Sequence, residues 1–212
     1  MARKIISGSK AIQIGVWGLL FLGALAAARA MSVLPPTFPE LVDESARIVR
    51  ARVIAVEPIH ATAPDGRSYI KTRVTWQVDR TLKGMAAGTL TLEFLGGTIG
   101  GESLRVPGMP QFAVGNEDYL FIEPNEKSIC PLLAAGHGRY PIKSDAATGR
   151  SYVMRSNGVP LTGVAQVAEP IEALSAAPAT RGTPGAAYAP DAFEAEILTT
   201  LAKIQEARHA QP

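Results

Sequence analysis

The stretch Tyr69-Ile70-Lys71-Thr72-Arg73-Val74-Thr75-Trp76-Gln77-Val78-Asp79 has the clearest alternation of apolar and polar residues in the chain. A period of two predicts a β-strand with one buried face and one face in solvent. Trp76 lies in the buried register, where a core role is favoured over a ligand platform. The solvent face is a candidate binding surface and consists of Lys71, Arg73, Thr75 and Gln77.

Further strand patterns flank this segment on both sides. Before it, residues 47–57 alternate in the same way, and the strand is expected to end at Pro58. Pro64-Asp65-Gly66 predicts the turn between these two strands. After it, we expect strands at residues 90–94, 104–106 and 119–122, the last paired with residues 129–133, and a terminal hairpin formed by residues 138–143 and 151–155.

Two helices are predicted outside the strands. Thr37-Phe38-Pro39-Glu40 has the spacing of a capping box, which predicts a short helix from Phe38 to Ser45. Residues 162–190 are rich in alanine, proline and glycine and are predicted to be a flexible linker. Beyond it, an apolar stripe predicts an amphipathic helix over residues 191–208, which docks on its own domain or on a partner. The stripe consists of Phe193, Ile197, Leu201 and Ile204.

Together these elements predict a mainly β fold. We expect an OB-like Greek-key five-stranded barrel over residues 31–161, with an extra C-terminal hairpin, a short N-terminal helix and a C-terminal amphipathic helix.

The first 30 residues have the three regions of a secretory signal peptide. A basic start at Arg3 and Lys4 precedes an apolar run over residues 11–28, and small residues allow cleavage between Ala30 and Met31. We therefore expect a periplasmic or secreted protein that meets the membrane only through this segment before cleavage. The alternative is an uncleaved anchor, because the apolar run approaches the length that spans a bilayer.

Cleavage would reverse the sign of the net charge. The chain has 21 basic and 19 acidic residues, and residues 1–30 hold four of the basic ones and no acid, so 17 basic residues remain. The remaining basic residues are interspersed with acids, and we expect no nucleic-acid partner. The single cysteine, Cys130, means that the domain has no internal disulfide.

The glycine-rich segment at residues 96–101 has two interpretations. Glycines let backbone N–H groups close on a phosphate, but phosphate loops lead into a helix, and residues 102–106 predict a strand. The pattern therefore favours a bend or bulge. Gly97, Thr98 and Gly100 from this segment complete the candidate binding site with Lys71 and Arg73.

Motifs for catalysis or metal binding are missing from the sequence, so no cofactor, metal or catalytic residue is expected. The acids Glu117 and Asp118 lie in a predicted turn and are interpreted as solvated. One enzymatic alternative stays open: a hydrolase or redox protein in which Cys130 and His137 meet in space as a thiolate pair. The competing interpretation of Cys130 is a small buried side chain.

Four segments, at residues 45–53, 74–84, 112–115 and 119–122, resemble an uncharacterised group of exported bacterial OB-like domains, some of which precede a matrixin-like zinc protease. The order of a strand, Leu82-Lys83-Gly84, a second strand and Phe-x-x-Gly-x-x-x-Tyr-Leu is also similar to the netrin-like domain of tissue inhibitors of metalloproteinases. That resemblance implies an OB-type barrel. The inhibitors reach the catalytic zinc with an N-terminal cysteine, and Met31 stands at the predicted mature N-terminus here, so their mechanism is not implied.

The function expected first is a non-enzymatic binding module of the cell envelope or secreted fraction, with a protein or peptide ligand. The enzyme built on Cys130 and His137 is one alternative. A structural envelope component acting through its C-terminal helix is the other.

Overall fold

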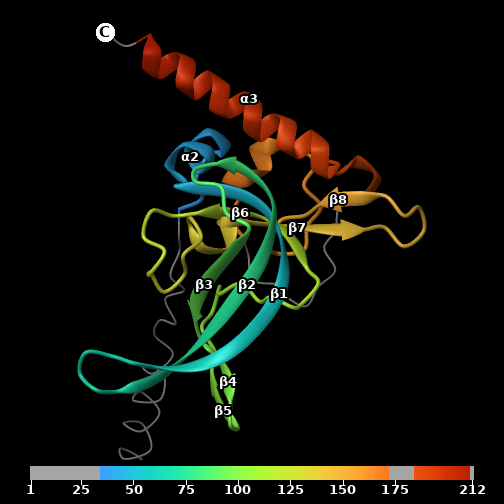
Figure 1. Cartoon of the computed structure of the whole chain (residues 1–212). Helices are drawn as coiled ribbons and strands as arrows, with labels where there is room; N and C mark the ends of the chain where they lie inside the picture. The colour runs from blue at the N-terminus through green and yellow to red at the C-terminus, as the bar shows by residue number, and fades with distance from the viewer. Residues whose placement is uncertain (1–33, 172–183, 211–212) are drawn as a thin grey trace, which may run out of the picture. The chain divides into compact units, whose positions relative to one another are not determined.

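A six-stranded antiparallel sheet dominates the computed structural model, which describes residues 34–171 and 184–210 (Figure 1). The predicted signal peptide and its cleavage between Ala30 and Met31 lie outside the described residues. The strand order is β3-β2-β1-β6-β7-β8, and β4 and β5 form a separate hairpin. The strands are β1 (Arg47–Thr62), β2 (Ser68–Lys83), β3 (Thr89–Leu95), β4 (Gly97–Ile99), β5 (Glu102–Leu104), β6 (Glu117–Ile122), β7 (Arg139–Ser144) and β8 (Ser151–Val153). The mainly β prediction is confirmed, and β7 with β8 is the expected terminal hairpin.

The sheet does not close, so the predicted five-stranded barrel is not confirmed. Strands β3 and β8 are its two edges. The interval between β3 and β6 is bridged only by an irregular segment: the Leu95 N–H donates to the Ile129 carbonyl at 2.9 Å, and Leu132 forms an isolated bridge with Ile122. Residues 129–133 are therefore paired with β6 as expected, but only through this bridge and neighbouring bonds.

Strands β1 and β2 continue together well beyond the rest of the sheet as a two-stranded ribbon (Figure 1). Strand β6 pairs with β1 only over Arg47–Arg52. On that side of β1, the last backbone bonds join Val53 to Gly115 and Asn116. Beyond Val53, this edge of β1 has no strand partner among the described residues.

The prediction that the first strand ends at Pro58 is wrong, since β1 continues to Thr62.

Two hydrogen bonds show that even-numbered residues of β2 direct their backbone groups to the β3 side of the sheet. The Ile70 carbonyl accepts from Gly96 N at 2.8 Å, and Val78 N donates to Gly88 O at 3.0 Å. Even-numbered residues of β2 in this ribbon therefore turn their backbone groups away from β1.

In antiparallel strands, two residues that lie directly opposite turn their backbone groups either toward each other or both outward. Val56, Pro58 and His60 lie opposite Val74, Thr72 and Ile70. Their backbone groups therefore point outward, to the free edge of β1. The N–H that Pro58 lacks would have faced this edge, so the ladder with β2 loses no bond there.

The core consists of two apolar clusters. Buried side chains of β1, β2 and β3 form cluster 2, which includes Val74 and Trp76, both fully buried as the alternation predicts. Cluster 1 lies among β6, β7 and the helices, and includes Phe121 and Tyr140.

Both predicted helices are present. Helix α2 (Phe38–Glu44) begins at Thr37 with the expected capping box. Helix α3 (Pro190–His209) docks on its own domain, because Phe193 and Ile197 are fully buried in cluster 1. A hydrogen bond of 2.9 Å from the Tyr119 hydroxyl to the Pro190 carbonyl and an ion pair of 2.8 Å between Arg80 and Glu194 hold its first turns.

The predicted flexible linker is packed at both of its described ends. Residues Val164–Ala168 form a 3-10 turn with Val167 fully buried, and Ala187 is also buried. The Arg150 guanidinium donates to the Gly185 and Ala187 carbonyls. The linker prediction is wrong for these ends, and residues 172–183 lie outside the described part. No helix in that described part is long and apolar enough to cross a membrane.

Candidate binding groove

A groove of about 630 Å³ opens between the β4–β5 hairpin, the loop at residues 105–112 and the sheet. We call it the hairpin groove. It is lined by Val56 and Pro58 of β1, Thr72 of β2, and residues 94–98, 103–107 and 109–112. The lining surface is divided about evenly between apolar and polar groups, and Arg105 is the only charged residue among the described lining residues. A concave site with apolar side chains and polar groups is a candidate for ligand binding.

Glycines fold the β4–β5 hairpin back over the sheet. Gly97 has a φ of +143°, and a Cβ atom there would lie 2.6 Å from the Thr72 hydroxyl oxygen. That hydroxyl donates to the Gly96 carbonyl at 2.7 Å. Gly100 and Gly101 also have positive φ and form the tight turn between β4 and β5. The segment is thus a bend and a turn, and it leads into a strand and not into a helix.

The loop at residues 105–112 forms the other wall of the groove, and a buried arginine contacts it. Arg139 of β7 forms an ion pair of 2.8 Å with Asp118 of β6, and its guanidinium lies 4.3 Å from the centre of the Phe112 ring. It also donates to the Gln111 carbonyl. Asp118 is fully buried, so its interpretation as a solvated acid is wrong. Burial raises the pKa of Asp118, and Arg139 opposes that shift.

Aromatic side chains form the floor. Phe94 and Phe112 line the groove with ring centres 4.9 Å apart, and Trp76 packs beneath them, 5.1 Å from Phe112. Trp76 is fully buried, so its predicted core role is confirmed. Phe94 is itself buried, so the half-buried ring of Phe112 is the part of this floor that a ligand can contact.

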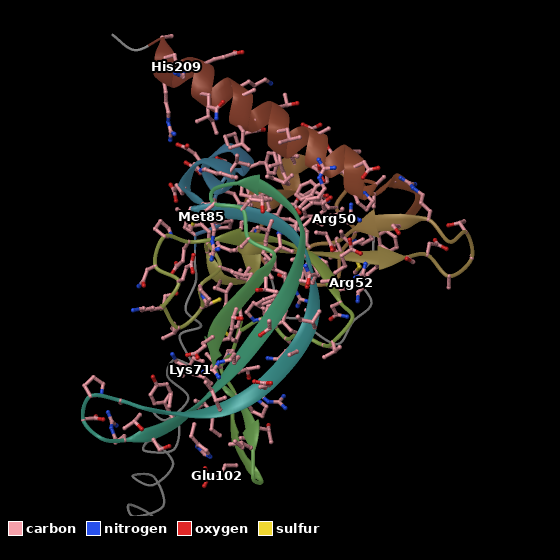
Figure 2. All side chains as sticks on the ribbon, in the orientation of Figure 1. Arg50, Arg52, Lys71, Met85, Glu102 and His209 are labelled. Carbon is pink, nitrogen blue, oxygen red and sulfur yellow. The ribbon has the colours of Figure 1, made fainter. Side chains whose placement is uncertain are left out.

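The structure divides the predicted binding residues into two groups. Gly97 and Thr98 line the hairpin groove, whereas Lys71, Arg73 and Gly100 do not. Lys71 and Arg73 lie on the other face of β2, where both pair with Glu93, at 3.2 and 2.9 Å. Hydrogen bonds from Arg73 lower the pKa of Glu93. Figure 2 shows Lys71 on the ribbon and Glu102 at the tip of the β4–β5 hairpin.

Most residues of the groove carry no sequence pattern that predicts binding. In the sequence, Val56, Pro58, Phe94 and Phe112 fit only strands or turns, and Arg139 fits a hairpin strand. The apolar residues of 104–112 lack a period, so no pattern marked them as a lining. Pro107, Met109 and Pro110 in one short irregular stretch were the available signal, since loops tend to carry binding residues.

Cys130 and His137 occupy different surroundings. Cys130 is half-buried and packs against cluster 2, and burial raises the pKa of its thiol to about 11. His137 is buried in a 3-10 turn, and burial lowers its pKa. In residues 34–171 and 184–210, no hydrogen bond joins the two side chains. A raised thiol pKa is also the opposite of what a cysteine nucleophile needs.

No family model matches the chain, and no curated protein sequence matches it either. No group of three or more His, Cys, Asp or Glu side chains in the described residues is placed to hold a metal ion.

Proposed function

We propose that this protein is an exported, non-enzymatic binding module that takes a protein or peptide ligand into the hairpin groove. The observation that carries the proposal is the groove itself, a recess of about 630 Å³ with a mixed apolar and polar lining over an aromatic floor. Arg139 and the glycine bend hold its two walls in place, so a ligand need not order them. Export is supported by the pattern of the first 30 residues.

A finer description of the fold also belongs to this proposal. We interpret the open sheet as an incompletely closed OB-like barrel, because residues 129–133 bond to the ends of both β3 and β6. In this interpretation the hairpin groove is the mouth of the barrel, where loops bind ligands in many OB-like domains. The resemblance to exported bacterial and netrin-like domains points in the same direction.

Site-specific photo-crosslinking tests the proposal. A photoreactive amino acid is placed at Thr98 in the groove or, as the matched control, at Thr199, which is exposed on α3. Irradiation of cells that export each variant should give a discrete adduct only from position 98. Equal adducts from both positions, or none above background from position 98, would contradict the proposal.

A further inference from the structure

The hairpin groove contains a strand edge with unused backbone groups. Two residues of β1 line the groove, Val56 and Pro58. They are also two of the residues whose backbone groups point to the free edge of β1, as their pairing with Val74 and Thr72 requires. Within the described residues, the N–H and C=O of Val56 and the C=O of Pro58 have no hydrogen-bond partner. Beside the groove, the described edge of β1 therefore has one unpaired donor and two unpaired acceptors in a row.

We propose that the ligand of this groove is an extended peptide segment that adds to the free edge of β1 as a further strand. This inference rests on the proposed binding function and names its ligand class. An added strand satisfies the unused groups of Val56 and Pro58 through its own backbone. Its side chains alternate, so every second residue points to the floor of the groove, where the ring of Phe112 is half-buried.

The charge of the groove selects among such peptides. Arg105 is the only charged residue of the lining, it is exposed, and it forms no ion pair within residues 34–171 and 184–210. The nearby cations Lys71 and Arg73, by contrast, both pair with Glu93 on the other face of β2. The favoured segment thus combines alternating apolar residues with one acidic residue for Arg105.

Selection from a random heptapeptide library on phage supplies the probe. The library is panned on the purified protein after depletion on Thr98→Arg, in which a long side chain fills the groove. The selected peptides should alternate apolar residues and contain an aspartate or glutamate. If no peptide survives depletion, peptide binding in the groove fails, and the proposed function fails with it in its peptide form.

Backbone methylation of a selected peptide then tests strand addition alone. N-methyl groups on the amides of one edge should weaken binding about tenfold, and the same groups on the other edge about twofold or less. Equal affinity of the two methylated peptides would overturn strand addition and leave groove binding standing.

Two substitutions in the protein, each with a matched control, complete the test. Val56→Pro removes the one backbone N–H that the two lining residues of β1 provide, and it should weaken binding about tenfold. His60→Pro removes an N–H on the same edge but outside the lining, and it should not weaken binding. Arg105→Glu should weaken the binding of an acidic peptide about tenfold, with Lys127→Glu as the charge-matched control on an exposed loop.

Sedimentation tests whether a second copy of the chain occupies this edge instead. If the protein self-associates and Val56→Pro abolishes the association, the occupant is a second copy and the proposal is overturned.

Discussion

Arg139 is the residue on which both the core and the groove depend. Its partner Asp118 is fully buried, and the arginine itself is almost so. An ion pair in such a place is worth little relative to an apolar pair, but removal of one partner leaves a buried charge without compensation. The same guanidinium supports the groove wall through Gln111 and Phe112.

We predict that Arg139→Gln lowers the free energy of unfolding by about 3–5 kcal/mol. The matched control is Arg73→Gln, which also removes the arginine of an ion pair, but at the surface, where the loss is about 0–1 kcal/mol. Urea denaturation of both variants measures the difference. Similar losses in the two variants would show that the buried pair has no special role.

Cys130 provides a second test at this scale. Because burial raises the thiol pKa to about 11, very little thiolate is present at neutral pH. We predict that a thiol reagent labels the native protein at pH 7.5 far more slowly than the urea-unfolded protein. Equal rates would revive the enzymatic alternative with His137.

Among the secondary structure elements, the β4–β5 hairpin depends on its glycines for different reasons. Gly97 combines a φ of +143° with a close approach to Thr72, whereas Gly100 has a φ of +57° and open space around it. We predict that Gly100→Ala costs about 1–2 kcal/mol, the ordinary penalty of a left-handed residue, and that Gly97→Ala costs more. Thermal unfolding followed by circular dichroism checks the order. A larger loss for Gly100→Ala would mean that the hairpin is not held against β2.

Helix α3 is the other element that invites a direct test. Phe193 is fully buried, and its ring lies 5.3 Å from Tyr119 and 5.2 Å from Tyr140. We predict that Phe193→Ala lowers the free energy of unfolding by about 3–5 kcal/mol. Leu198→Ala, on an exposed face of the same helix, should change it by about 0.5 kcal/mol or less. If Phe193→Ala is equally mild, the helix is free to act on a partner, as the structural alternative requires.

The sequence predicts the presence of the secondary structure elements better than their boundaries. Alternation found β2 because one face of that strand is buried against cluster 2. Pro58 was misleading because its effect depends on whether the strand edge is free, and pairing partners far along the chain decide that. The composition of residues 162–190 predicts a flexible linker, but Val167 and Ala187 are buried there. They are single apolar residues, and no periodic pattern marks them as part of the core. Residues 21 apart, such as Asp118 and Arg139, meet only through strand pairing.

At the scale of the whole molecule, stability should depend on the charge of His137. Burial lowers the pKa of this histidine in the folded state, and the nearby Arg155 adds to the shift, while the Val167 backbone opposes it. The unfolded chain, with an ordinary pKa of about 6.5, therefore takes up the proton first as the pH falls. Stability from this group is present above pH 6.5 and is lost as the pH drops toward the folded-state pKa.

We predict that the free energy of unfolding falls between pH 7 and pH 5, and that His137→Gln reduces this fall. His60→Gln, at an exposed position on β1, should leave the slope unchanged. Urea titrations at several pH values measure the slope for each protein. The same slope in the parent protein and in His137→Gln would exclude His137 as its source.

The proline at the free edge of β1 also bears on solubility. An unpaired strand edge is a template on which identical chains stack into fibrils, and proteins commonly blunt such edges with proline or charge. Pro58 interrupts the row of donors between Val56 and His60, while Glu57 adds a charge to the exposed ribbon. Pro58 and Glu57 are therefore the features of this ribbon that oppose the stacking of identical chains on its edge.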